Sequence, residues 1–155
     1  MSTEDNKAIV RRYVEEVWTK RNIDALEEVY PGPDLVEQYG PAGQGLPSLG
    51  DAKEYVRKVQ AAFPDLSVTI EDMIAEGDRI AVRTTWRGTY MGEAIGGIPP
   101  TGQSVSGFGT VIWGITDGKI AQVFGTSLDS ELDRLGLWEF LMSHGEVCWK
   151  HPFYH

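Results

Sequence analysis

The sequence predicts a single α+β domain, in which a few helices pack on one side of a curved antiparallel sheet and form a cone around a deep apolar pocket. The first third of the chain has helical periodicity, residues 66–128 alternate apolar with polar positions, and glycines stand inside the predicted strands. Helices followed by hairpin-linked strands are typical of α+β domains. Glycines inside strands mark bends or bulges, which would curve the sheet.

The predicted helices occupy the first 63 residues. Ser2 and Asp5 form an S-x-x-D capping box, which starts the first helix. Apolar residues follow it at helical spacing: Ile9, Val10, Tyr13, Val14, Val17 and Trp18. A short helix is then expected over residues 23–30, and a third helix begins at a second capping box and covers residues 48–63.

Strands dominate the second half. The alternating segments cover residues 66–70, 80–86, 105–115 and 120–128. Turn residues separate them, including Asp117-Gly118, which has hairpin turn chemistry. A last helix is expected after Ser130. Residues 144–155 have no period, so we expect a domain over residues 1–143 and a C-terminal tail.

Composition excludes several classes of protein. A length of 155 residues suits one domain, and a net charge of -9 argues against nucleic acid and anionic membrane surfaces as partners. The single cysteine, Cys148, forms no intramolecular disulfide, which fits a reducing cytoplasm. The N-terminus lacks a signal-peptide pattern, and no stretch is apolar enough to span a bilayer. The expected location is therefore cytoplasmic.

A series of short motifs gives the sequence its specificity. In order they read AFPDL at 62–66, EGDRIAVR at 76–83, GTYMG at 88–92, IPPTG at 98–102 and DGKI at 117–120. This series resembles the SnoaL-like polyketide cyclases of the NTF2-like superfamily, over residues 7–137. The IPPTG loop joined to the DGKI hairpin is the most specific part of the resemblance.

The resemblance implies a cone-shaped NTF2-like α+β barrel, a homodimer packed through the sheet, and neither a metal nor an organic cofactor. Well-known members close a ring of an aromatic polyketide by intramolecular aldol addition, with a pocket aspartate as acid/base. The wider superfamily includes dehydratases, epoxide hydrolases and ketosteroid isomerases, and a fold alone does not choose among these chemistries.

Several positions depart from the pattern that the family often shows. The segment after the second helix, residues 35–39, lacks the usual histidine, and Trp113 stands in place of an arginine. On the last strand, Gln122 and Val123 replace Glu and His. The pocket is therefore expected to be more neutral than usual. The aspartate that ends this strand is present as Asp129.

Three residues are candidates for catalysis. Asp129, at the rim of an apolar cavity, would be desolvated, which raises the pKa of a carboxyl group and suits an acid/base; alternatively it only caps the last helix. Gln122 and Gln38 would donate amide hydrogen bonds to an oxyanion, unless they are surface or packing amides. Gln122 and Phe124 share one face of the strand, and Asp129 falls on the other unless a bulge at Gly125 shifts the register.

Aromatic side chains are the candidates for substrate binding, with ordinary core packing as the alternative. They are Trp113, Tyr39, Tyr13, Phe124 and Trp86. The tail carries His144, Cys148, His151 and His155 at metal-like spacing. We expect no metal there, because the segment has no evident second shell, and a tail that folds over the pocket mouth or the dimer partner is favoured.

The function expected from these residues is ring closure in natural-product biosynthesis. The substrate would be an apolar, polyketide-derived small molecule, and closure would follow an aldol route through Asp129 or a shape-driven route in a neutral pocket. A [4+2] cyclase, a dehydratase or isomerase of the same fold, and a non-catalytic binding module stay open as alternatives.

Overall fold

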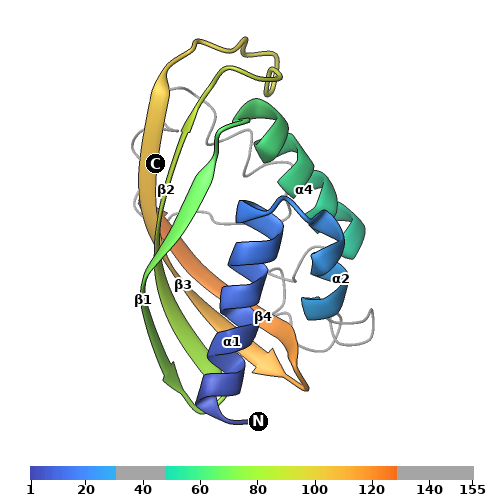
Figure 1. Cartoon of the computed structure of the whole chain (residues 1–155), viewed down its shortest axis with the longest axis vertical. Helices are drawn as coiled ribbons and strands as arrows, with labels where there is room; N and C mark the ends of the chain where they lie inside the picture. The colour runs from blue at the N-terminus through green and yellow to red at the C-terminus, as the bar shows by residue number, and fades with distance from the viewer. Residues whose placement is uncertain (31–47, 129–155) are drawn as a thin grey trace, which may run out of the picture.

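The computed structural model describes residues 1–30 and 48–128, and for residues 122–128 it describes the backbone pairing alone (Figure 1). The elements are α1 (Thr3–Tyr13), the π-helix η1 (Val14–Thr19), the 3-10 turn η2 (Ile23–Ala25), α2 (Leu26–Val29), α4 (Leu49–Ala62), β1 (Ser67–Glu76), β2 (Arg79–Thr89), β3 (Ser104–Thr116) and β4 (Lys119–Leu128). The predicted α+β class is confirmed. The proposed limit of the domain at residue 143 lies outside the described residues.

The four strands form one antiparallel sheet in the order β1-β2-β3-β4, and the helices lie on one side of it (Figure 1). The residues that face the helices are Val68, Ile70, Met73 and Ala75 of β1, Ile80, Val82, Thr84 and Trp86 of β2, and Val111 and Trp113 of β3. We call this the concave face, and the opposite side the convex face. Every concave position in this set is uncharged.

Two bulges keep the apolar residues on the concave face. The pairing of β1 with β2 skips Glu71, and the pairing of β3 with β4 skips Ala121. A bulge adds one residue to one strand, so the alternation of faces reverses beyond it. The bulge at Ala121 therefore gives Ile120 and Val123 the same face, although their numbers differ in parity. The bulge that the sequence left open at Gly125 is absent, because Gly125 pairs in register with Val111.

Buried apolar residues between the helices and the sheet form the core. Val10 of α1 and Val29 of α2 pack with Ile80, Ile115 and Ile120 of the sheet. A second group joins the helices to one another, and a third lies where the end of α4 meets the loop after β2. The predicted capping box of α1 is confirmed, with the Ser2 hydroxyl accepting from the Asp5 backbone N–H. At α4, the Ser48 hydroxyl accepts from the Asp51 backbone N–H.

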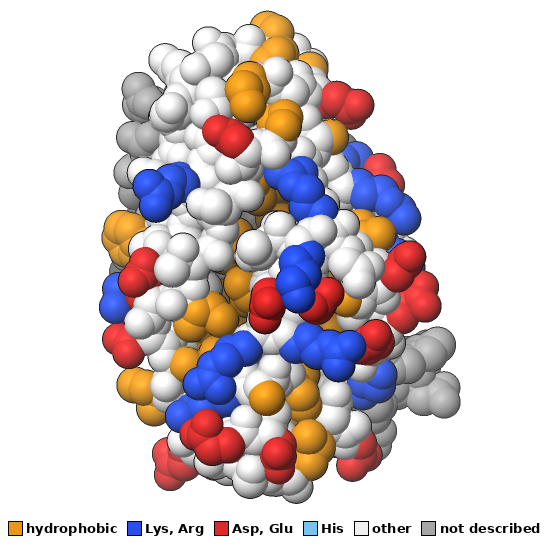
Figure 2. Space-filling view, viewed as in Figure 1, with side chains coloured by type: hydrophobic (Ala, Val, Ile, Leu, Met, Phe, Trp, Pro, Cys, Tyr) orange, Lys and Arg blue, Asp and Glu red, His pale blue; other side chains and the backbone are white. Residues whose placement is uncertain are grey.

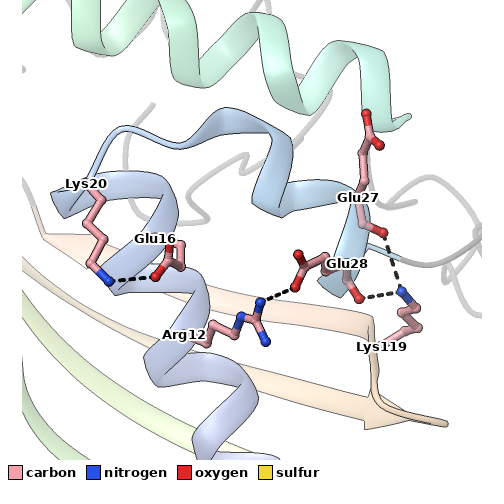
Figure 3. A network of polar contacts seen from close by, with 6 residues as sticks. All are labelled: Arg12, Glu16, Lys20, Glu27, Glu28 and Lys119. Carbon is pink, nitrogen blue, oxygen red and sulfur yellow. Dashed lines mark hydrogen bonds and ion pairs between the residues drawn. The ribbon is translucent and has the colours of Figure 1, made fainter.

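Polar contacts fix the short helix α2 against its neighbours (Figure 3). Lys119, at the turn into β4, donates to the backbone carbonyls of Glu27 and Glu28 at the end of α2. Arg12 of α1 pairs with the Glu28 carboxylate. These cations meet the helix end at which carbonyls lack partners and the helix dipole is negative. Figure 2 shows this side of the molecule, where acidic and basic side chains alternate.

The C-terminal end of α4 is the junction of three segments. Arg21, which follows η1 and has a φ of 59°, donates to the carbonyls of Phe63 and Pro64. The backbone N–H groups of Gly92 and Glu93, in the loop after β2, bond to the last carbonyls of the helix at 3.1 and 2.9 Å. The loop is therefore attached to the helix end by its backbone.

Gly92→Ala tests this junction. A Cβ at position 92 would lie 1.8 Å from the Ala61 carbonyl oxygen, a backbone atom with little freedom to move. We expect a loss of about 1–3 kcal/mol in the free energy of unfolding, as for other overpacked sites, measured by urea denaturation. Gly50→Ala is the matched control, since its nearest contact is an ordinary 3.9 Å and alanine is the better helix former. Equal stability of the two variants would contradict the close approach at Gly92.

Candidate active site

Three aromatic residues meet where α1 crosses the concave face, and we call them the aromatic cluster: Tyr13, Trp18 and Trp113. The rings of Tyr13 and Trp113 are 5.2 Å apart at a 60° angle, a tilted arrangement that aromatic pairs favour. The Trp18 indole Nε1 donates to the Tyr13 hydroxyl oxygen at 3.0 Å. Tyr13 packs against both the sheet group and the helix group of the core, so its hydroxyl lies between the two layers.

Burial keeps the phenol of Tyr13 protonated. Desolvation raises the pKa of Tyr13 to about 12, because a phenolate would lose its hydration, and an ionised Tyr55 would raise it further. The hydrogen bond from Trp18 acts in the opposite direction, since an N–H donor stabilises the phenolate. At neutral pH Tyr13 is therefore a hydrogen-bond donor and acceptor, not a base.

A second buried tyrosine, Tyr30, lies in the same part of the core as Tyr13 and Trp18. Burial raises the pKa of Tyr30, and the ionised forms of Tyr13 and Asp51 would raise it further. Its phenol is therefore also neutral near pH 7. The described part of the concave face thus offers neutral hydroxyl and indole groups, and it carries no carboxylate or cation.

Trp86 lies apart from the aromatic cluster, although it shares the concave face. It packs with Phe63 and Tyr90 at the end of α4. Trp113 pairs with Ile80, and Trp86 lies six positions further along β2 than Ile80, a rise of about 20 Å. The two tryptophans therefore lie near opposite ends of the concave face.

Comparison with known proteins identifies the fold family. The family model for SnoaL-like polyketide cyclases matches residues 8–127.

The chain belongs to the SnoaL-like polyketide cyclase family. Similar solved structures agree with this assignment. AclR of Streptomyces galilaeus, proposed to be a hydroxylase, is 28% identical with a TM-score of 0.70, and the match covers 87% of each chain. A proposed polyketide cyclase from Acidithiobacillus ferrooxidans is 25% identical with a TM-score of 0.64, covering 93% of this chain and 99% of that one. IdmH of Streptomyces antibioticus, a proposed polyketide cyclase, shares the fold at 24% identity, a TM-score of 0.64 and coverage of 88% and 97%. No curated protein sequence matches the chain.

In this SnoaL-like chain, the structure brings together two of the predicted binding residues, Tyr13 and Trp113. Trp86 is separated from them. Asp129, Gln38 and Tyr39 lie outside the described residues, as do the four His and Cys residues of the tail. Their proposed roles stay predictions.

Gln122 and Phe124 are described by backbone pairing alone. Gln122 is opposite Gly114 and Phe124 is opposite Ile112, which is a convex position. Val123, between them, is opposite Trp113. The backbone register thus gives the concave position to Val123. Simple alternation counted from Ile120 would give it to Gln122, and the bulge at Ala121 causes the difference.

The contact between Trp18 and Tyr13 is the part of the site that sequence reasoning missed. The helical periodicity predicts one α-helix for both residues, and in an α-helix residues five apart do not face each other. The only sequence signal is the Tyr-x4-Trp spacing. This spacing indicates a contact only if the helix changes to π-helical winding after Tyr13. The described residues hold no group of three or more metal-ligating side chains, and none of their helices is long and apolar enough to cross a membrane.

Tyr13 predicts a loss of stability in alkali. In the unfolded chain its phenol ionises near pH 10, whereas in the folded protein it holds its proton to about pH 12. The contribution of the Tyr13 phenol to the free energy of unfolding is therefore complete below pH 10. Between pH 10 and 12 about 2–3 kcal/mol of it is lost. Urea unfolding at pH 9 and pH 11.5 measures this loss. In Tyr13→Phe the decline should be smaller by about that amount, and an unchanged decline would show that Tyr13 ionises normally.

Proposed function

We propose that this protein is a cofactor-independent cyclase of the cytoplasm that closes a carbocycle in an apolar, polyketide-derived intermediate. The observation that carries the proposal is the uncharged concave face of a SnoaL-like sheet, with Tyr13 and Trp113 in contact on it. We further propose that the domain extends to residue 143 and that residues 144–155 form a separate tail over the pocket mouth or the partner.

The middle of the concave face supports a substrate pocket. Between the positions of Trp113 and Trp86, the face carries Thr84 opposite Gly109, and Gly107 opposite Trp86 itself. These small residues contribute little side-chain volume, and we place the proposed substrate chain over them. Orientation of two reacting carbons in such a pocket can lower the barrier by about 7–11 kcal/mol at best.

Asp129 is the proposed acid/base of the aldol route. The register places Val123 opposite Trp113 and Ser127 opposite Gly109, both concave positions. Because strand residues alternate, Asp129 has the parity of Val123 and Ser127. This parity supports Asp129 as the base that removes a proton from the α-carbon of a substrate carbonyl, the carbon that then attacks as the nucleophile.

An amide is the proposed partner of the enolate oxygen, and the candidates are Gln38 and Gln122. The pairing of Gln122 with Gly114, on the convex parity, favours Gln38. Tyr39 and Phe124 complete the proposed binding residues, with Phe124 the weaker of the two because it is paired with convex Ile112.

A [4+2] closure is the second candidate, and the same neutral face favours it. A pericyclic reaction needs a shaped cavity and a hydrogen bond to a carbonyl rather than a proton transfer, and Trp113 occupies the position at which the family often has a cation. A dehydratase or isomerase would need Asp129, and a binding module would need no chemistry at all.

Metabolite mass spectrometry of the source strain separates these functions. The arms are the intact gene, a deletion, Asp129→Asn, Trp113→Ala, and the control Asp72→Asn, whose carboxylate pairs with Arg83 on the convex face. Deletion should accumulate an uncyclised isomer of the product. A mass difference of one water would indicate a dehydratase, and a difference of one oxygen a hydroxylase like that proposed for AclR.

The variants then choose the mechanism. On the aldol route Asp129→Asn should lower ring closure about 100-fold or more, as loss of general acid/base catalysis does, while the control keeps full activity. Ring closure that survives Asp129→Asn but not Trp113→Ala, with the fold intact by circular dichroism, would establish shape-driven closure instead. Unchanged metabolites in the deletion would favour the binding module.

A homodimer through the convex face is part of the proposal. One row across this face is apolar on all four strands: Ile74, Ala81, Ile112 and Phe124. Ile74 is 69% exposed and Ile112 is 39% exposed, and Phe108, 54% exposed, lies four residues before Ile112 on the same face of β3. Exposed apolar residues gathered on one sheet face are typical of protein interfaces.

Ile112→Glu tests the dimer. A carboxylate in the middle of the apolar row would have to be desolvated on association, so the variant should be monomeric at concentrations at which the unchanged protein is dimeric. Analytical ultracentrifugation measures this directly. Ala8→Glu, an exposed helix position away from the sheet, is the control and should not change the mass. A dimeric Ile112→Glu would place the interface elsewhere.

A further inference from the structure

Helix α1 changes its winding directly after Tyr13. Over Val14–Thr19 the chain forms a π-helical turn, in which the Lys20 N–H bonds to the Glu15 carbonyl, five residues back, at 2.8 Å. In an α-helix, residues five apart are separated by about 140° around the axis, because each residue turns the chain by about 100°. The wider π turn, with its i→i+5 bonds, brings residues five apart close to one line along the axis.

This winding explains how Trp18 reaches Tyr13. The two residues are five apart, and the indole Nε1 of Trp18 lies 3.0 Å from the Tyr13 hydroxyl oxygen. In a continuous α-helix the two side chains would leave on different sides, and the hydrogen bond would not form. The π turn is thus the local structure that makes the Tyr-x4-Trp spacing a contact.

The hydrogen bond from Trp18 leaves the Tyr13 hydroxyl with its proton available for donation. A tyrosine hydroxyl has one proton to donate and an oxygen that accepts. The Trp18 N–H occupies the oxygen, and among the described residues no acceptor takes the proton. Burial keeps this proton on the oxygen at neutral pH, and a donor on the oxygen polarises the O–H bond and makes it a stronger donor.

The surroundings of Tyr13 indicate what kind of group accepts its proton. Its ring touches Trp113 on the concave face, and apart from the phenol of Tyr30 and the indole of Trp18 its neighbours in the core are apolar. We propose that Tyr13 donates its phenolic proton in a hydrogen bond to a carbonyl oxygen of the substrate, and that Trp18, held by the π-helical turn, is the positioning residue that aims this donor. This inference deepens the proposed function and rests on its pocket over the concave face.

The first experiment tests the positioning and needs no ligand. The chain has five tryptophans, and each gives an indole ¹⁵N–¹H signal by NMR, among which Trp18→Phe identifies that of Trp18. In Tyr13→Phe the Trp18 signal should move upfield, toward that of an indole without an acceptor. In Trp18→Phe the pKa of Tyr13, followed by the ¹³Cζ resonance, should rise further. Trp86→Phe removes an indole from the other end of the concave face and should leave both signals of the pair unchanged.

The second experiment tests the ligand-facing donor with 1-tetralone, a bicyclic aromatic ketone, by quenching of tryptophan fluorescence. Tyr13→Phe should weaken its binding about three- to ten-fold, the range for one net hydrogen bond. Trp18→Phe should weaken it less in the unchanged background and not at all in the Tyr13→Phe background. This non-additivity separates positioning through Tyr13 from a general packing defect, which would weaken binding in both backgrounds.

The outcomes separate this inference from the proposed function. A Trp18 signal that ignores Tyr13→Phe overturns the positioning role, whatever the ligand does. Tetralone that binds equally well to Tyr13→Phe overturns the donor role and leaves the pocket standing. Failure of tetralone to bind any form, with the deletion strain also unchanged, overturns the pocket and with it the donor role.

Discussion

The contact between α1 and the concave face of the sheet is the interaction on which the rest of the structure depends. The sheet presents apolar residues on one side only, and a surface of this kind has to be covered. Val10, fully buried, meets Ile80 and Ile120 at this contact. Tyr13, one turn further along α1, packs against the sheet at the aromatic cluster. The helix that completes the core is therefore also the helix that presents a polar group to the proposed pocket.

Charge is segregated between the two faces of the sheet. On β2 the concave residues are Ile80, Val82, Thr84 and Trp86, whereas the convex residues include Arg79 and Arg83. Ionic chemistry at the concave face therefore has to come from the strand ends or from the segments around it. For this reason the aldol hypothesis depends on Asp129, which follows β4 in the sequence, and shape-driven closure is its main competitor.

Much of the fold could be predicted because local chemistry and global structure agree. The capping residues Ser2 and Ser48 begin helices, the Asp117-Gly118 turn joins two strands, and Asp117 takes the positive φ of 50° that such turns need. The sequence does not predict which residues of β4 share a face, because the bulge at Ala121 depends on how β4 pairs with Gly114 and Ile115 of β3. No local sequence pattern in β4 marks this bulge.

The site was predictable in kind but not in arrangement. The sequence predicts Tyr13, Trp113 and Trp86 as binding residues; Tyr13 and Trp113 are in contact, whereas Trp86 belongs to another part of the core. The role of Trp18 escaped because a π turn costs intrinsic helix stability and is held by tertiary packing, which a periodic pattern does not record. Alternation and helical period thus locate side chains only up to the first bulge or change of winding.

The order of the strands has a consequence for folding. Each strand pairs with its predecessor, so β1 to β4 can assemble in succession as the chain is made. The first helix cannot complete its packing in this way, because Val10 rests on Ile115 and Ile120, which come from the far end of the described chain. Contacts between distant segments slow folding, since a large loop must close first. Helix α1 is therefore synthesised before the strands, and its apolar stripe cannot be fully covered until β3 and β4 have emerged.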